Sequence, residues 1–188
     1  MRKRYLLILA ACALVLTGCL VTSVYPFYTQ KDVVFEPALA GTWTNASEGE
    51  ERWEFAAVST NNYRLSFMTK DATNVVQATL FKIQTTLFLD LFNGEIGDEV
   101  QPPPIPSHFL FRVKQIKPTV KMSPMDYEWL TKFLAQDPRA LRHHLIGDEK
   151  DKDKQRLVLT ADTADLQKFI VKHLDTAEAW KDTTELTK

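Results

Sequence analysis

Cysteine is almost absent from this sequence: its 188 residues include only Cys12 and Cys19. Residues 20–188 therefore contain no thiol, which excludes disulfide bonds, thiolate metal sites and cysteine nucleophiles from that part of the chain. Glycine is also scarce, with six residues. The sequence has no Gly-rich phosphate loop, no Gly-x-Ser-x-Gly elbow and no His-Glu-x-x-His zinc pattern. We therefore expect no enzyme active site and no cofactor.

Neither sign of charge is in large excess. The sequence has 23 basic and 24 acidic residues, and three of the basic ones lie at positions 2–4. Without residues 1–18 the chain has 20 basic against 24 acidic residues, a net charge of −4. A mildly acidic chain has no general attraction to polyanions, so no nucleic-acid partner is expected.

The first eighteen residues have the order of a secretory signal peptide. Three basic residues are followed by an apolar run over residues 5–15 and then by small residues directly before Cys19. The run is shorter than the roughly 18 residues that a membrane-spanning helix needs. The four residues at its end resemble the bacterial lipobox: Leu16, Thr17, Gly18 and Cys19.

The resemblance to bacterial lipoproteins implies that residues 1–18 are removed and that Cys19 becomes an acylated N-terminus. Such proteins carry fatty acyl chains, palmitate among them, and two or more chains hold a protein stably on a bilayer. Leu20 differs from the aspartate that resembles an inner-membrane retention signal. The resemblance thus implies a lipid-anchored domain outside the cytoplasm, on the cell membrane or on the periplasmic face of an outer membrane.

A single domain is expected beyond this anchor. Residues 19–40 are predicted to form the lipidated N-terminus and a short tether, and residues 41–188 a single β-rich domain. The tether lacks the Gly/Ser-rich composition of a flexible linker. Its aromatic residues Tyr25, Phe27 and Tyr28 favour either contact with a membrane interface or packing on the domain itself.

Alternation of apolar and polar residues predicts a mainly β, α+β fold. Residues 53–57 and 63–67 alternate across a polar turn, and residues 75–83 and 87–92 form a second predicted pair of strands. Further strands are expected at 109–113, near 120–122 and at 157–159. An antiparallel meander of this kind is expected to form a curled sheet or a small barrel.

Two helices are predicted in the last third of the chain. One runs from Pro124 to about Ala135, with Ser123 as its N-cap, and precedes the last predicted strand. The other begins after Asp162 and is predicted to be C-terminal. Its apolar stripe consists of Leu166, Phe169, Ile170 and Leu174.

Gly41-Thr42-Trp43, placed on the first predicted strand of the domain, resembles the Gly-x-Trp signature of lipocalin barrels. The resemblance implies an eight-stranded barrel that either holds one small ligand or is filled by its own side chains. The chain departs from the lipocalin pattern because a predicted helix interrupts strands seven and eight. The run of residues 80–91 also resembles bacterial lipoproteins of unassigned function.

Asp90 is the polar residue that stands out on the predicted strands. It shares a face with Phe88 and Phe92, so it either points to solvent beside aromatic rings or is a buried carboxylate that needs a partner. His108 is the partner that would form a pocket site, and Arg64 and Arg112 are the other candidates. The alternative interpretation is that Asp90 has only a structural role.

Other polar groups give weaker indications. His143 and His144 are neighbours and diverge, so they are poorly placed to share a metal ion. His173 lies at the edge of the stripe of the last predicted helix, where a packing role is expected. Residues 148–154 alternate acids with lysines and lack the calcium-loop pattern.

Two functions follow as hypotheses. The first is a lipid-anchored, non-enzymatic binding or structural module of the cell envelope, with the membrane and another envelope protein as partners. The alternative is a lipocalin-like carrier of a small apolar ligand. They differ in whether the inward faces leave a cavity, and the bulky residues expected to fill it are Trp53, Phe55, Phe67, Phe81 and Phe111.

Overall fold

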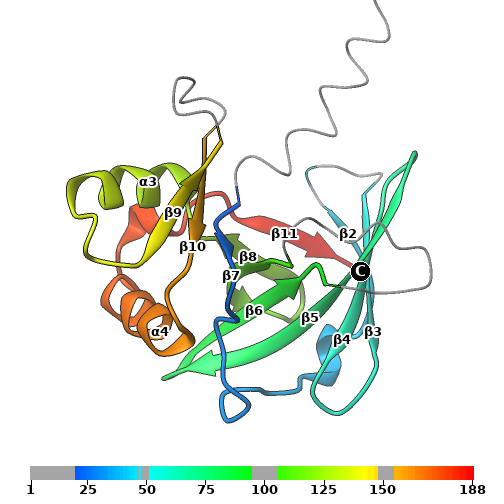
Figure 1. Ribbon diagram of the computed structural model, residues 1–188. Coiled ribbons are helices and arrows are strands. Elements are labelled where there is room, and N and C mark those ends of the chain that lie inside the picture. Colours follow the sequence, from blue (N-terminus) through cyan, green and yellow to red (C-terminus); the bar gives the residue numbers. More distant parts are fainter. Residues whose placement is uncertain (1–19, 46, 48–50, 95–105, 148–154) are drawn as a thin grey trace, which may run out of the picture.

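A closed antiparallel β-barrel forms the larger part of the protein, with a smaller helical layer on one side (Figure 1). The computed structural model describes residues 20–45, 47, 51–94, 106–147 and 155–188. The barrel strands are β2 (Gly41–Asn45), β3 (Arg52–Ala57), β4 (Tyr63–Met68), β5 (Thr73–Ile83), β6 (Thr86–Phe92), β7 (His108–Gln115), β8 (Val120–Pro124) and β11 (Thr184–Thr187).

Seven of these strands form a meander, and the eighth closes it. Each strand from β2 to β7 pairs with the next one along the chain, and β11 lies between β8 and β2. Leu186 of β11 is level with Val120 on one side and with Asn45 on the other. The barrel therefore depends on a four-residue strand near the C-terminus.

The barrel interior is filled by its own side chains. Alternate residues of the strands point inward, as the period of two requires. Each fully buried large side chain contributes roughly 1.5–3 kcal/mol relative to exposure. The inner core consists of Leu39, Trp43, Trp53, Phe55, Tyr63, Leu65, Ala78, Leu80, Leu89, Leu91, Phe111, Val113, Val120, Met122 and Leu186.

Gly41 and Trp43 fix the start of the barrel. Gly41 has φ +122°, a conformation that other residues rarely adopt. The Trp43 indole is 1% exposed, and its N–H donates to the carbonyl of Leu39 over 2.8 Å. The ammonium of Lys188 lies 4.6 Å from the Trp43 ring centre. The Gly-x-Trp sequence thus places its tryptophan at the point where the two ends of the barrel meet.

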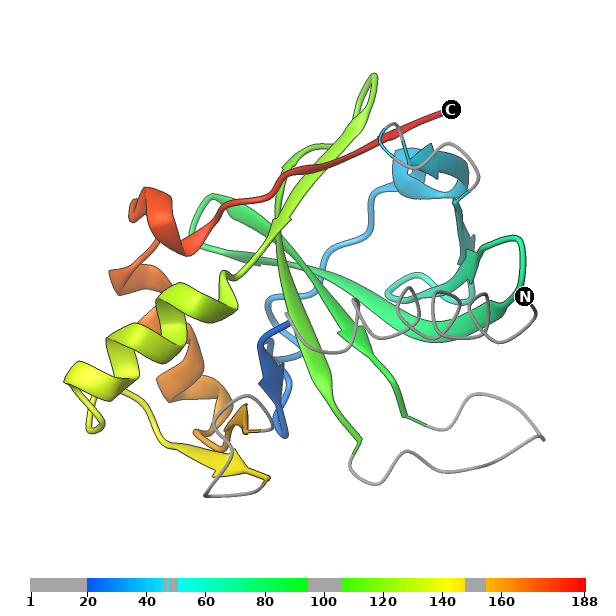
Figure 2. The same cartoon turned by 90° about the horizontal axis from the view of Figure 1, so that it is seen from above.

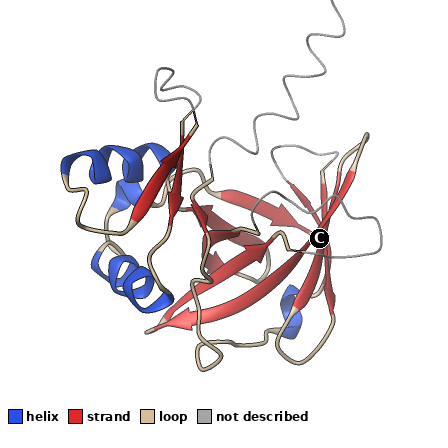
Figure 3. Ribbon diagram, viewed as in Figure 1, coloured by secondary structure: helices blue, strands red, loops and turns tan. Residues whose placement is uncertain are grey.

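The helical layer is inserted between β8 and β11. It contains α3 (Tyr127–Gln136), the hairpin of β9 (His143–Ile146) and β10 (Arg156–Leu159), and α4 (Thr163–Lys172). Figure 3 shows both α-helices on the same side of the barrel, and Figure 2 shows this layer beside the barrel from above. A short strand, β1 (Thr22–Ser23), joins β10 to β7 and so connects the hairpin to the barrel wall.

A second core lies between the barrel's outer face and this layer. It includes Phe81 and Phe88 from the barrel, Leu130 and Leu134 from α3, and Phe169 from α4. The η3 turn (Ala177–Ala179) and Trp180 follow α4 and pack into the same core.

Residues 20–40, expected to form a tether, are packed into the domain. Val21, Phe27 and Leu39 are each no more than 2% exposed. The amide of Val34 donates to the carbonyl of Leu80, and η1 (Pro37–Leu39) leads into β2. Because Phe27 is buried and Tyr28 is half-buried, they are not available to a membrane interface, although Tyr25 is 48% exposed. The domain boundary therefore lies before residue 41.

The predicted hairpins are confirmed. Residues 53–57 and 63–67 lie in β3 and β4, and the longer pair lies in β5 and β6. The predicted antiparallel barrel is present.

The end of the chain differs from the prediction. Residues 157–159, expected as the last barrel strand, belong to β10 of the side layer, and β11 closes the barrel instead. The helix after Asp162 is consequently not C-terminal. The helix α3 begins after Asp126, whose carboxylate accepts from the amide of Trp129, while Ser123 lies in β8. The strand pairing of residues 120–124 overrides the capping signal at Ser123.

Candidate functional site

The Asp90 and His108 side chains meet on the outer face of the barrel. Asp90 lies in β6 directly opposite Leu110 of β7, and His108 lies two residues away on that strand, which makes the two a diagonal cross-strand pair. The Asp90 Oδ1 atom is 2.8 Å from His108 Nδ1. Asp90 is 1% exposed and His108 8%. The structure thus brings together the two residues singled out in the sequence.

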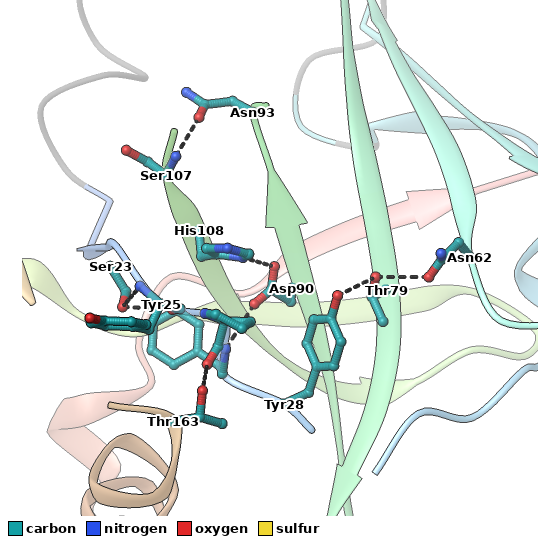
Figure 4. A network of polar contacts seen from close by, with 12 residues as sticks. Ser23, Tyr25, Tyr28, Asn62, Thr79, Asp90, Asn93, Ser107, His108 and Thr163 are labelled. Atoms are coloured by element: carbon teal, nitrogen blue, oxygen red, sulfur yellow. Dashed lines mark hydrogen bonds and ion pairs between the residues drawn. The ribbon is translucent and has the colours of Figure 1, made fainter. Parts of the chain in front are cut away.

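The N-terminal segment covers this pair. The amide of Phe27 donates to the second oxygen of Asp90, Oδ2, over 3.1 Å. Helix α4 holds the segment in place, because Thr163 donates to the carbonyl of Pro26 and Gln167 to that of Phe27. Figure 4 shows Asp90 between the barrel and this covering segment. Both carboxylate oxygens are therefore used within the protein.

A second polar chain runs beside Asp90. The hydroxyls of Tyr28 and Thr79 are 3.4 Å apart, and Thr79 donates to Asn62 Oδ1 over 3.1 Å (Figure 4). Burial raises the pKa of Tyr28, its hydrogen bond with the Thr79 hydroxyl opposes this rise, and the nearby Asp90 charge adds to it. Tyr28 therefore stays a neutral phenol at physiological pH.

Asp90 orients the imidazole of His108. In their hydrogen bond the Nδ1–H donates to the carboxylate, which fixes the direction in which the ring points. The ring also stacks on Phe92, with centroids 4.6 Å apart. The nearest strand neighbour, Ser23, is level with His108, but its hydroxyl exchanges hydrogen bonds with the backbone of Tyr25. The geometry supports anchoring of the N-terminal segment, and ligand binding by the pair stays a prediction.

The other candidate partners of Asp90 have different contacts. Arg112 donates to the carbonyl of Leu174 and lies 6.0 Å from the ring centre of Trp180. Arg64 is exposed on β4. The role of the Phe27 amide could not be predicted, because the sequence left open whether the aromatic residues of this segment contact a membrane interface or pack on the domain.

Other depressions lie elsewhere on the surface. One, of about 480 Å³, is lined by residues 85–87 and 112–116. Another, of about 290 Å³, lies between residues 139–142 and α4 and includes four basic side chains, Arg139, Arg142, Lys168 and Lys172. Arg142 and Lys168 are paired with Asp165. Neither depression includes Asp90 or His108.

His143 and His144 lie on β9, where successive side chains point to opposite faces. Their side chains therefore diverge, as expected. Within the described ranges, no three His, Cys, Asp or Glu side chains are grouped closely enough to hold a metal ion.

His173 packs among aromatic rings at the end of α4. Its ring centre lies 5.1 Å from that of Trp129, 4.8 Å from Phe133 and 4.6 Å from Phe169. Its Nε2 atom is buried and has no hydrogen-bond partner among the described residues. Burial lowers the pKa of His173 from its ordinary value of 6.5, and the charge of Lys172 lowers it further.

The lowered pKa of His173 is expected to make the free energy of unfolding depend on pH. The unfolded chain binds a proton near pH 6.5, whereas folded His173 binds it only at lower pH, so the unfolding free energy falls as pH drops below 6.5 and levels off below the folded pKa. We expect a lower melting temperature at pH 5 than at pH 7.5, and a smaller difference in His173→Phe. His144→Gln, which changes an exposed histidine, is the matched control. Equal pH dependence in His173→Phe and the parent protein would contradict this assignment.

The proposed lipidation site lies outside the described residues. Leu16, Thr17, Gly18 and Cys19 precede Leu20, the first residue that the structure describes. No helix in the described part of the chain has the length and apolar character needed to cross a bilayer. Comparisons with protein families, with curated proteins and with solved structures found no match to this chain.

Proposed function

We propose that this chain is a lipid-anchored cell-envelope protein whose barrel is a non-enzymatic binding or structural module that acts through its outer surface. The observation that carries the proposal is the filled interior. Trp43, Phe55 and Tyr63 are each no more than 1% exposed and occupy the space that a carrier would leave for a ligand. A barrel with such an interior would meet its partners through its outer surface.

The aromatic residues expected to fill the barrel divide between the two cores. Trp53, Phe55 and Phe111 are buried inside it, and Phe67 packs against them while half-buried. Phe81 lies on the outer face, where it helps to seat the helical layer. The outer face of β5 to β7 is thus already used by the protein's own helices, which leaves the rest of the barrel wall for partners.

One interior atom favours the alternative, a carrier of a small apolar ligand. The Trp53 indole N–H is buried inside the barrel and has no acceptor among the described residues. A buried donor without a partner costs about 1–3 kcal/mol, which a ligand oxygen would offset. Native mass spectrometry of the Cys19→Ser chain after signal removal tests this. A co-purifying small molecule supports the carrier, and protein of bare polypeptide mass supports the outer-surface module.

Anchoring is supported by the sequence before Leu20. The intact mass of the wild-type protein is expected to lack residues 1–18 and to include a diglyceride and a further acyl chain on Cys19. The Cys19→Ser chain that has lost residues 1–18 is expected in the soluble fraction, because only the acyl chains would hold it on the bilayer. A wild-type mass without added lipid, together with equal membrane association of the two forms, would reject the anchor.

A further inference from the structure

β1, β10 and β9 lie side by side in one sheet, and this sheet places Leu20, before β1, near the exposed C-terminal end of β9. Thr22 of β1 is level with Val158 of β10, and Val158 with His144 of β9. Continued by two residues, the same register puts Leu20 level with Arg156, which pairs with Ile146. Neighbouring strands lie about 4.8 Å apart, so Ile146 lies about 10 Å from the line of β1.

The edge formed by β9 has one exposed apolar side chain on each of its faces. β9 is the last strand in the sheet order, so one side of it has no strand partner in the described part of the chain. Leu145 is 55% exposed although it pairs with buried Leu157, and Ile146, on the opposite face, is 45% exposed. Exposed apolar side chains on an unpaired strand edge favour association with an apolar surface of another protein or with a membrane.

No spacer separates this edge from the residue that would carry lipid. Leu20 forms a backbone bridge with Asp126, and β1 is paired on both sides, with β7 and with β10. Cys19 is the next residue, and consecutive Cα atoms lie about 3.8 Å apart. Acyl chains on Cys19 would therefore bring the bilayer surface against this end of the sheet.

We infer that the β9 edge, with Leu145 and Ile146, inserts into the interface of the bilayer that holds Cys19. The inference rests on the proposed lipid anchor. We choose a bilayer as the partner that covers the β9 edge, because the lipid anchor would hold the bilayer next to this edge in every molecule. A strand from another protein would have to displace the bilayer. The domain then lies flat on the membrane, and the β3–β4 turn, on the other side of the barrel in both views, faces away (Figures 1 and 2).

Site-specific fluorescence tests this orientation. Acylation converts the Cys19 thiol into a thioether, so a cysteine introduced elsewhere is the only free thiol of the mature protein. Ile146→Cys is labelled with bimane in the lipidated protein, which is placed in phosphatidylcholine vesicles with or without doxyl-labelled lipid. Val58→Cys, at a site that is 68% exposed in the β3–β4 turn, is the matched control.

The doxyl lipid is expected to reduce the emission of the label at position 146 at least twofold and to leave that at position 58 unchanged. If intact mass shows the lipid but both labels respond alike, the orientation is wrong while the anchor stands. If the label at position 146 is shielded from aqueous iodide yet untouched by doxyl lipid, a protein covers β9 and the inference is overturned. A chain without lipid overturns the proposed function and this inference together.

Discussion

Replacing Asp90 with alanine is expected to lower the free energy of unfolding by about 3–5 kcal/mol. The substitution leaves two buried donors, His108 Nδ1–H and the Phe27 amide, without an acceptor. Each unpaired buried donor costs about 1–3 kcal/mol. Chemical denaturation of the Cys19→Ser mature chain measures the loss. Asp71→Ala, in the exposed β4–β5 turn, is the matched control and is expected to change stability by less than about 0.5 kcal/mol.

Asp90→Asn separates the two roles of the carboxylate. The asparagine side chain has one acceptor oxygen and an NH2 group that cannot accept, so it can pair with only one of the two donors. We therefore expect the free energy of unfolding of Asp90→Asn to lie between that of the parent protein and that of Asp90→Ala. Hydrogen exchange at Phe27 reports the covering segment directly, and it should be faster in Asp90→Ala than in Asp71→Ala. An Asp90→Ala protein as stable as the parent would show that the pair does not hold the segment.

The contact between Asp90 and His108 was one of three pairings that the sequence left open for Asp90, and it could be proposed because it involves only neighbouring strands. Because side chains alternate between the two faces of a strand, Asp90 was expected on the same face as Phe88 and Phe92. Phe92 pairs with His108, which places that histidine diagonally across from Asp90. The third partner, the Phe27 amide, lies 63 residues from Asp90 in sequence. A backbone group has no side-chain signal, so only the folded chain identifies it.

The missed elements are those too short to carry a pattern. β1 has two residues and β9 and β11 have four each, whereas the predicted hairpin strands β3 to β6 have six or more. Within β11 only Leu186 is buried, so the segment shows no alternation that a window could detect. Its strand conformation comes from pairing on both sides with β8 and β2. The strand conformation of β11 is therefore set by its pairing with β8 and β2, and not by the local propensity of its residues.

Removal of residues 184–188 is expected to have the largest effect of all, a loss of more than about 5 kcal/mol. That is comparable to the whole stability of a typical domain, so cooperative unfolding should disappear. The deletion removes Leu186, which is fully buried, and leaves the facing edges of β2 and β8 without a partner. Leu186→Ala alone should cost about 2–5 kcal/mol, since it creates a cavity but keeps the backbone pairing.

Deletion of Lys188 alone is the matched control for this truncation. It removes an exposed ammonium that contacts the Ala40 carbonyl and the Trp43 ring, interactions worth about 0.5–1 kcal/mol. Calorimetry should therefore give a cooperative transition for the Lys188 deletion and for Leu186→Ala, and none for the deletion of residues 184–188. A cooperative transition at the parent temperature in that truncated chain would mean that the seven-stranded meander is stable when open, and that β11 does not close a barrel on which the fold depends.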